Sequence, residues 1–172
     1  MDAAHATVVV VMGVSGSGKT TIGQRVAAQL GCEFLEGDER HPPANVAKMR
    51  AGEPLDDEDR RPWLRDLAGW IASRLGGGDG GVVACSALKR SYRDILRGGA
   101  EGVFFVHLAA SREVISQRVA SRTHDFMPAD LLDSQFADLE PLQPDEVGVT
   151  VDVTRDRASI VGDIVAAIEA AR

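Results

Sequence analysis

The sequence predicts an α/β fold in which a five-stranded parallel sheet is flanked by helices. Strand-like and helix-like segments alternate along the 172 residues, which is the pattern of a doubly wound sheet. The strand-like segments are continuous apolar runs, and such runs are typical of parallel strands that are buried on both faces. The first run leads into a glycine-rich stretch that opens an amphipathic helix. A chain of this length suits a single domain, residues 1–172.

The elements follow one another in the order that this fold requires. Residues 7–13, TVVVVMG, form a β-branched apolar run that predicts the first strand. Ile22, Val26 and Leu30 share one face of the helix that follows, and Gly31 suits its C-cap. Further strands are expected over 32–37, 82–86, 102–109 and 148–154, and further helices over 42–49, 54–75, 91–97, 111–122, 128–140 and 156–172.

Four residues within these elements are predicted to have structural roles: two tryptophans, one proline and one histidine. Trp63 and Trp70 belong to an apolar stripe at helical spacing, which is typical of a packed core rather than of a ligand platform. Pro62 predicts a kink or a fresh start within the same helix, because proline cannot continue the ladder of backbone hydrogen bonds. His107 lies inside the fourth apolar run and is interpreted as a core residue whose hydrogen-bonding groups are satisfied.

Composition and charge exclude several classes of protein. A net charge of −7 and an isoelectric point near 5.1 argue against a nucleic-acid-binding surface. The apolar runs are too short to cross a bilayer, so no membrane partner is expected. Cys32 and Cys85 lie in or beside apolar runs and are predicted to be buried, reduced thiols rather than a disulfide, which favours a cytoplasmic location. No Cys and His spacing typical of a zinc site is present in the sequence.

A phosphate-binding loop is the strongest motif of the chain. Residues 13–20, GVSGSGKT, match G-x-x-x-x-G-K-[ST] between an apolar strand and an amphipathic helix, the context that distinguishes this loop from a glycine-rich turn without a ligand. Its glycines let backbone N–H groups surround a phosphate, and the helix dipole adds positive potential. Lys19 would bridge the β- and γ-phosphates of ATP, and Thr20 would bind Mg²⁺ directly. The predicted ATP-binding residues of the loop are Gly13, Ser15, Gly16, Ser17, Gly18, Lys19, Thr20 and Thr21.

The ends of the second and third strands suggest where the metal is supported. The third strand ends in VVACSALKR and lacks the usual aspartate that helps to hold magnesium. The second strand ends in FLEGD, and its carboxyl end is expected beside the phosphate loop. Glu36 is therefore predicted to support Mg²⁺ through water, and the alternative is a plain charge at the end of the strand. A guanine-reading N-K-x-D motif is absent from the sequence, which argues against a GTPase.

Four stretches of the chain resemble one family closely. They are residues 13–23 (GVSGSGKTTIG), 36–64 (EGDERHPPANVAKMRAGEPLDDEDRRPWL), 84–97 (ACSALKRSYRDILR) and 124–142 (HDFMPADLLDSQFADLEPL). Together they resemble the small ATP-dependent gluconokinases, which phosphorylate D-gluconate to 6-phospho-D-gluconate. The resemblance implies a P-loop fold like that of nucleoside monophosphate kinases and related to shikimate kinase. It also implies a homodimer and a lid segment over about residues 118–130.

The predicted substrate site combines one carboxylate with several cations. Asp38 can accept a hydrogen bond from the attacking hydroxyl and serve as a base or as an orienting group. Gluconate carries a carboxylate and many hydroxyl groups, so cationic side chains are expected around it. The alternative for each cation is a solvated surface charge, and Arg60 and Lys89 are the preferred candidates. The candidate substrate residues are Asp38, His41, Lys48, Arg60, Lys89, Arg90 and His124.

The lid is expected to bring arginines to the nucleotide. Arg118 and Arg122 lie one helical turn apart just before THDFMP, which resembles the arginine-bearing lid of these kinases. The resemblance implies that one guanidinium lies near adenine and the other on the phosphates, with Arg122 as a catalytic residue beside Lys19 and Asp38. The alternative is an amphipathic helix that carries surface arginines at this spacing.

Two other functions stay open at the level of sequence. One is a related small-molecule kinase that acts on shikimate or on a nucleoside monophosphate. The other is a binding module that uses the phosphate loop as a nucleotide-controlled switch. Asp38 and the lid arginines favour a kinase over a switch, and the long family-specific stretches favour gluconate as the substrate.

Overall fold

The computed structural model describes residues 5–121 and 129–172, and its core is a five-stranded parallel sheet. The strand order is β2-β3-β1-β4-β5, so the chain begins in the middle of the sheet and builds outward on both sides. Every pairing is parallel. This confirms the predicted fold class. The strands are β1 (Val8–Met12), β2 (Phe34–Glu36), β3 (Gly81–Ala84), β4 (Val103–Ala109) and β5 (Gly148–Asp152).

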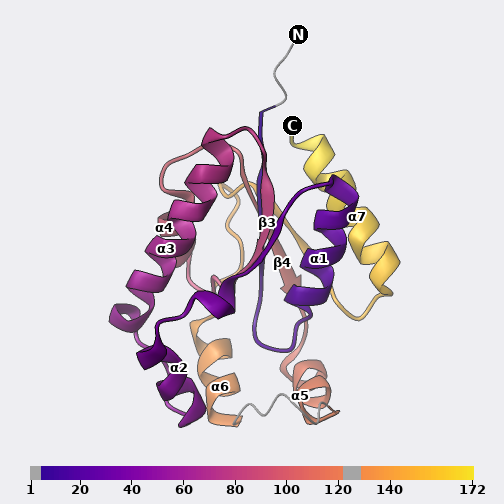
Figure 1. Ribbon diagram of the computed structural model, residues 1–172. Coiled ribbons are helices and arrows are strands. Elements are labelled where there is room, and N and C mark those ends of the chain that lie inside the picture. Colours follow the sequence, from indigo (N-terminus) through magenta and orange to yellow (C-terminus); the bar gives the residue numbers. More distant parts are fainter. Residues whose placement is uncertain (1–4, 122–128) are drawn as a thin grey trace.

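Helices cover both faces of the sheet (Figure 1). α1 and α7 lie on one face, and α3 and α4 lie on the other. The short α2, α5 and α6 gather near the carboxyl ends of the strands, at the bottom of the view. The helices are α1 (Lys19–Leu30), α2 (Pro43–Arg50), α3 (Asp57–Gly76), α4 (Arg90–Arg97), α5 (Arg112–Ser121), α6 (Ala129–Asp138) and α7 (Arg157–Ala170), with the 3₁₀ helix η1 (Gly37–Arg40) after β2.

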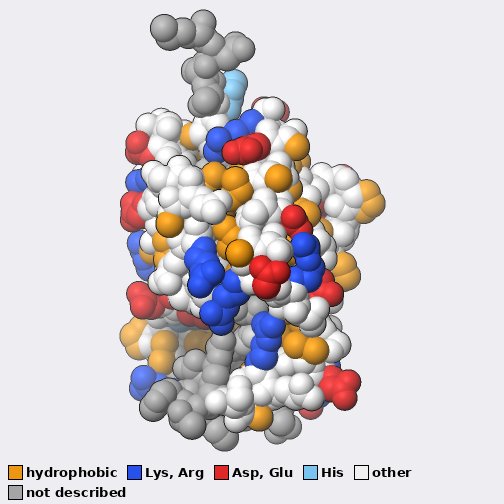
Figure 2. All heavy atoms as spheres, turned by 90° about the vertical axis from the view of Figure 1, so that its right-hand side faces the viewer, with side chains coloured by type: hydrophobic (Ala, Val, Ile, Leu, Met, Phe, Trp, Pro, Cys, Tyr) orange, Lys and Arg blue, Asp and Glu red, His pale blue; other side chains and the backbone are white. Residues whose placement is uncertain are grey.

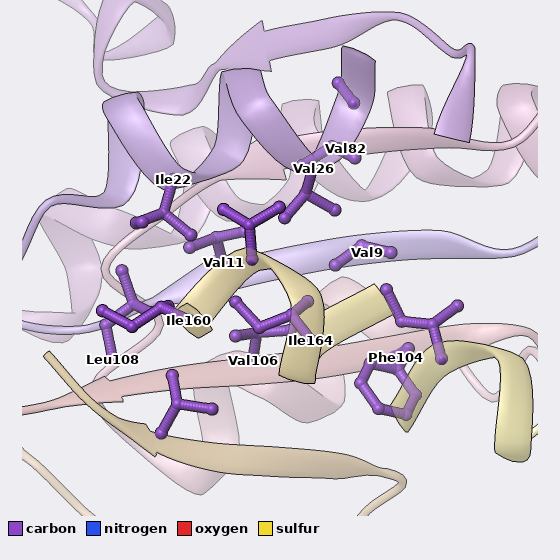
Figure 3. Close-up of a cluster of buried hydrophobic side chains, with 14 of the residues drawn as sticks. Val9, Val11, Ile22, Val26, Val82, Phe104, Val106, Leu108, Ile160 and Ile164 are labelled. Atoms are coloured by element: carbon purple, nitrogen blue, oxygen red, sulfur yellow. The ribbon is translucent and has the colours of Figure 1, made fainter. Parts of the chain in front are cut away.

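The alternating side chains of β1 divide the core between the two faces. Val9 and Val11 point toward α1 and α7, where they pack with Ile22, Ile160 and Ile164 (Figure 3). The neighbouring β1 side chains point to the opposite face and pack against α3 and α4. Because both faces of the strand are covered, every β1 residue is apolar and fully buried.

The helix α3 passes through Pro62 without interruption. It begins with a capping box in which the carboxylates of Asp56 and Asp59 bond each other's backbone N–H groups. The predicted fresh start at Pro62 is therefore wrong. Proline leaves the carbonyl four residues earlier without its usual helical donor, and that carbonyl belongs to the exposed Glu58 in the first turn. Burial of Trp63 and its apolar neighbours against the sheet then stabilises the rest of the helix.

The interpretations of the cysteines and of His107 are confirmed in part, because Cys32 is only half-buried and the buried Nδ1 atom of His107 has no hydrogen-bond partner among the described residues. Cys32 and Cys85 are free thiols, and Cys85 is fully buried. His107 is 5% exposed, and burial, followed by the charge of Arg93, lowers its pKa and favours the neutral imidazole. No helix among residues 5–121 and 129–172 combines the length and apolar character that crossing a membrane requires.

A buried arginine joins the loops that follow β3 and α6. The Arg93 side chain is fully buried and donates to both carboxylate oxygens of Glu146, at 2.7 and 3.0 Å. It also donates to the carbonyl oxygens of Ala87, Leu88 and Pro141. This one side chain therefore holds together segments that are about fifty residues apart in sequence.

Replacing Arg93 by methionine should lower the free energy of unfolding by about 3–5 kcal/mol, because it leaves the buried Glu146 carboxylate without its cation. Urea unfolding followed by circular dichroism measures the change. The matched control is Arg61→Met, which breaks an exposed pair with Glu58 and should cost at most about 1 kcal/mol. Equal losses for both variants would contradict the structural role of Arg93.

Candidate active site

The candidate site lies at the carboxyl edge of the sheet, where β1 turns into α1. The second strand ends beside this turn, and α2, α5 and α6 surround it (Figure 1). In parallel α/β sheets, ligands bind outside the carboxyl ends of the strands, at the point where the strand order reverses. Here that point is β1, which has β3 on one side and β4 on the other.

The glycines of the phosphate loop hold backbone conformations that other residues rarely adopt. Gly13, Gly16 and Gly18 have φ angles of 152°, 84° and 98°. A Cβ atom on Gly13 would lie 2.7 Å from the Ser17 hydroxyl oxygen, and one on Gly16 would lie 2.9 Å from the Val119 side chain. The loop can adopt this conformation because glycines occupy these positions. The conformation lets backbone N–H groups surround a phosphate.

The ammonium group of Lys19 is held inside this loop. Its Nζ atom donates to the carbonyl oxygens of Gly13 and Val14, each at 3.1 Å, and the residue is only 9% exposed. The cation is therefore placed within the loop that would surround a phosphate. This placement agrees with the predicted role of Lys19 in binding the β- and γ-phosphates.

The two predicted magnesium residues lie in direct contact. The Thr20 hydroxyl donates to a carboxylate oxygen of Glu36. Glu36 is brought there by the pairing of β2 with β3, opposite Ala84. A hydroxyl and a carboxylate are hard oxygen donors of the kind that Mg²⁺ prefers, so these residues fit the ion. In the part of the chain that the structure describes, no group of three or more acidic, His or Cys side chains could hold a metal alone, so phosphate and water oxygens would complete its shell.

Asp38 follows directly after a very close approach between β2 and β3. A Cβ atom on Gly37 would lie 2.2 Å from the carbonyl oxygen of Ala84, so only glycine fits there. The indole N–H of Trp63 donates to the Gly37 carbonyl at 2.8 Å and holds the start of η1. Trp63 is thus a core residue, as predicted, that also positions Asp38.

The charge of Asp38 influences the pKa of the buried Cys85 thiol. Burial, and after it the charge of Asp38, raises the pKa of Cys85 to about 12. The hydrogen bond with the Ala87 backbone and the charge of Lys19 act to lower this pKa, and the charge of Glu36 raises it to a smaller extent. Cys85 therefore stays a neutral thiol at physiological pH. The same interactions indicate that Asp38, Glu36 and Lys19 surround one end of β3, where the usual aspartate is missing.

His41 lies between Asp38 and the core. Its ring stacks on Trp63 with 3.9 Å between the ring centroids. Burial lowers its pKa, the charge of Asp38 opposes this, and Arg60 reinforces it. The amide nitrogen of Asn45 donates to the Asp59 carbonyl at 2.8 Å and lies 3.2 Å from His41 Nδ1. Because an amide nitrogen can only donate, Nδ1 is the acceptor, and the neutral ring carries its proton on Nε2.

Arg60 and Lys89, the two preferred substrate cations, converge on one cluster. Arg60 is 8% exposed and donates to the Tyr92 hydroxyl at 2.7 Å and to Asp138 at 3.3 Å. Lys89 donates to Asp57 at 3.2 Å and lies 3.9 Å from Asp138. The Tyr92 hydroxyl donates to Asp57, and both cations lie against its ring. We call Arg60, Lys89, Tyr92, Asp57 and Asp138 the acid-site cluster.

The other two substrate cations have different partners. Lys48 forms an ion pair of 2.9 Å with Asp59, the partner of the N-cap Asp56 in the capping box of α3, and the hydrogen bond to Asp59 raises the pKa of Lys48. Arg90 forms a two-pronged pair with Asp145 and bonds Asp94 on its own helix. Lys48 and Asn45 therefore share Asp59 as a partner, which places Lys48 near His41. Arg90 instead holds the loop before β5. None of the contacts described for Arg90 reaches the acid-site cluster, so its role in substrate binding stays a prediction.

Arg118 lies beside the phosphate loop, in a pocket of about 360 Å³. Its guanidinium donates to the Val153 carbonyl at 2.7 Å. The pocket opens on the side of α1 and α7, where Figure 2 shows Lys and Arg side chains gathered in the lower half of the face. Arg122 and His124, and most of the expected lid, lie outside the described residues. The pocket is lined by Ser17, Gly18, Thr21, Ile22, Arg118, Ser121, Val153, Arg155, Asp156, Arg157 and Ile160.

Several site residues were missed by sequence reasoning. Asp57 had a weak local signal, because it lies in the same acidic run as Arg60. Tyr92 is the only tyrosine of the chain, but it lies on an ordinary amphipathic helix. Asp138 and Gln135 had no local signal, since their partners lie 78 and 120 residues away in sequence.

Comparison with known proteins places the chain among P-loop kinases. The family model described as an AAA domain matches residues 8–142. A gluconokinase from Gluconobacter oxydans (strain 621H) is 50% identical over 142 residues, which cover 83% of this chain and 80% of that protein.

Two crystal structures share both sequence and fold with the chain. A sugar kinase from Janibacter sp. HTCC2649 is 49% identical with a TM-score of 0.87, and the match covers 95% of this chain and 98% of that one. A gluconokinase from Sinorhizobium meliloti 1021 is 44% identical with a TM-score of 0.86, covering 96% of this chain and 93% of that one. With the phosphate loop, the Thr20 and Glu36 pair and the acid-site cluster at one edge of the sheet, these matches lead to one conclusion. The chain belongs to the gluconokinase family of P-loop kinases.

Proposed function

We propose that this protein is a gluconokinase, which transfers the γ-phosphoryl group of ATP to D-gluconate and yields 6-phospho-D-gluconate and ADP. Family membership supports the assignment. The observation that carries it is the position of the acid-site cluster at the same edge of the sheet as the phosphate loop. A buried arginine and a lysine there are suited to the carboxylate of a sugar acid.

The reaction needs little covalent chemistry from the protein. A hydroxyl oxygen of gluconate forms a bond to the γ-phosphorus, the bond to the bridging oxygen of ADP breaks, and the hydroxyl proton passes to Asp38. Lys19 balances the charge on the phosphoryl oxygens. Magnesium, when bound beside Thr20 and Glu36, supplies further charge stabilisation.

The acid-site cluster would orient the other end of the substrate. Arg60 and Lys89 bind the carboxylate, and the Tyr92 hydroxyl and Asp57 exchange hydrogen bonds with the sugar hydroxyls. The neutral His41 can donate from Nε2 toward the same region. Binding energy at this end holds the reacting hydroxyl in line with the phosphoryl group, which is the main source of rate in such reactions.

A coupled assay of ADP release tests the assignment. Purified protein with MgATP should turn over D-gluconate faster than other aldonates, and should leave shikimate and nucleoside monophosphates unreacted. D-Glucose, which has the hydroxyl groups but lacks the carboxylate, is the matched control and should react slowly. Faster turnover of shikimate or of a nucleoside monophosphate would refute the proposal.

Replacing Arg60 by lysine should raise the KM for gluconate about tenfold, which corresponds to about 1.4 kcal/mol, and leave the KM for ATP within about twofold. Lysine keeps the charge but loses the planar fork that can bond a carboxylate and Tyr92 together. The adjacent Arg61→Lys is the control, since Arg61 pairs with Glu58 on the exposed face of α3. A larger effect on the KM for ATP would place Arg60 in the nucleotide site instead.

Three further features belong to the same proposal. We expect a requirement for Mg²⁺, which removal by a chelator and restoration by added magnesium would test. We also expect one kinase domain that forms a homodimer, which sedimentation at several concentrations would test. The two free thiols are compatible with a cytoplasmic location.

A further inference from the structure

Helix α6 contacts both halves of the candidate site. At one turn, the side-chain oxygen of Gln135 accepts a hydrogen bond of 2.7 Å from the backbone N–H of Ser15 in the phosphate loop. At the next turn, Asp138 accepts from Arg60 at 3.3 Å and lies 3.9 Å from Lys89. Residues three apart share one face of a helix, so the two contacts come from the same side of α6.

We propose that α6 couples the two substrate-binding sites, with Gln135 and Asp138 as its positioning residues. Asp138 pairs with the two cations that would receive the substrate carboxylate, and Gln135 links the same helix to the phosphate loop. Binding of ATP breaks the hydrogen bond between Gln135 and Ser15, and the resulting shift of α6 moves Asp138 away from Arg60 and Lys89. These cations can then bind the substrate carboxylate, so each substrate favours binding of the other. This inference rests on the proposed function, because it takes the sugar acid as the ligand of Arg60 and Lys89.

The contacts of Asp138 support its role as a carboxylate that a substrate displaces. Its two oxygens face two different cations, as the oxygens of a bound carboxylate would. Both distances are longer than the 2.7 Å bond between Arg60 and Tyr92, so the pair is the looser part of the cluster. The side chain is also 27% exposed and therefore has room to move away.

The packing of α6 explains how the two contacts are linked. Leu132 of α6 packs with Val14 of the phosphate loop, and Ile115 of α5 belongs to the same buried cluster. The backbone N–H of Glu140, just after α6, donates to the Leu88 carbonyl at 2.7 Å, next to Lys89. A short helix held at both ends moves as one body, so a shift at Gln135 reaches Asp138.

A phosphate in the loop competes with Gln135 for the same kind of donor. The oxygens of a bound nucleotide accept hydrogen bonds from backbone N–H groups of the loop, and a charged acceptor is stronger than a neutral amide. The Ser15 N–H that Gln135 now holds belongs to this set of groups. By thermodynamic linkage, the factor by which ATP tightens gluconate equals the factor by which gluconate tightens ATP.

Isothermal titration with gluconate, with and without a saturating non-hydrolysable ATP analogue and Mg²⁺, tests the proposal. In the wild-type protein the analogue should lower the Kd of gluconate by about fivefold or more. Asp138→Asn should lower the Kd of gluconate without nucleotide, because it removes a competing charge at nearly constant size, and the effect of the analogue should shrink toward none. Gln135→Leu should lower the Kd of gluconate without nucleotide toward the value that the wild type shows with the analogue, because the bond to Ser15 is already absent, and the effect of the analogue should shrink.

Controls separate this inference from the proposed function and from simple damage. Asp66→Asn makes the same chemical change in an exposed pair with Arg40 and should behave as wild type. Amide exchange at Ser15, followed by NMR, should be faster in Gln135→Leu. Weaker binding of gluconate by Asp138→Asn, or an unchanged effect of the analogue in both variants, would overturn the inference. Failure of the wild-type protein to phosphorylate gluconate would instead overturn the proposed function.

Discussion

Lys19→Met is expected to reduce the rate of phosphoryl transfer by at least about a thousandfold, at the upper end of the loss for a single charge-stabilising donor. The buried ammonium lies within the phosphate loop, bonded to two of its carbonyl oxygens. It is therefore in place before ATP arrives and needs little rearrangement. Methionine has a similar length and flexibility but cannot balance the charge that develops on the migrating phosphoryl group.

Steady-state turnover of gluconate, measured by ADP release, gives the size of the loss. Circular dichroism is the control for folding and should show an unchanged fold. Arg61→Met removes an exposed cation on α3 and should retain full activity. More than about a tenth of wild-type activity in Lys19→Met, a loss below about 1.4 kcal/mol, would contradict the role of Lys19.

Asp38→Asn should lower kcat for gluconate by about a hundredfold to ten thousandfold, which is the usual contribution of a positioned general base. The substitution keeps the size of the side chain and removes its charge and most of its basicity. The start of η1 should persist, because the Gly37 carbonyl still accepts from Trp63 and no side chain at position 38 takes part in that contact. Binding of ATP, measured by titration, should change by less than about threefold.

The opposite pattern would assign Asp38 to another task. Weaker binding of ATP with undiminished turnover of bound gluconate would make Asp38 a nucleotide or metal residue. Asp66→Asn again serves as the control, since its carboxylate pairs with Arg40 at the end of the same 3₁₀ helix. That variant should retain wild-type kcat if the effect at position 38 is chemical and not structural.

Most of the fold could be read from local patterns in the sequence. The apolar run at β1 predicts a strand that is buried on both faces, and the structure places it at the centre of the sheet. The helix spacing of Ile22 and Val26 predicted the face of α1 that packs on the sheet. The fresh start expected at Pro62 does not occur, because tertiary packing of Trp63 outweighs the single hydrogen bond that proline removes, and the local pattern does not reveal that packing.

The phosphate loop and the contact between Thr20 and Glu36 were predictable for a different reason. Gly13 and Gly18 are required by backbone conformation, which is a property of a few consecutive residues. Thr20 and Glu36 are distant by only sixteen residues, and the rule that parallel strands end at one edge brings them together. Because the usual aspartate is missing at the end of β3, the sequence predicts that Glu36 lies beside the phosphate loop in its place.

The sequence by itself determined the sheet, the phosphate loop and the set of cations from which the acid site is drawn. The sequence also favoured Arg60 and Lys89, but only the tertiary structure shows that these two converge on one cluster while Arg90 pairs with Asp145, because burial and choice of partner depend on segments far apart in the chain. The tertiary structure also brought α6 onto both half-sites, through contacts with Ser15 and Arg60 that span 120 and 78 residues. Local patterns carry no information about such contacts. An apolar helix face predicts that the face is buried, but it does not predict which segment packs against it.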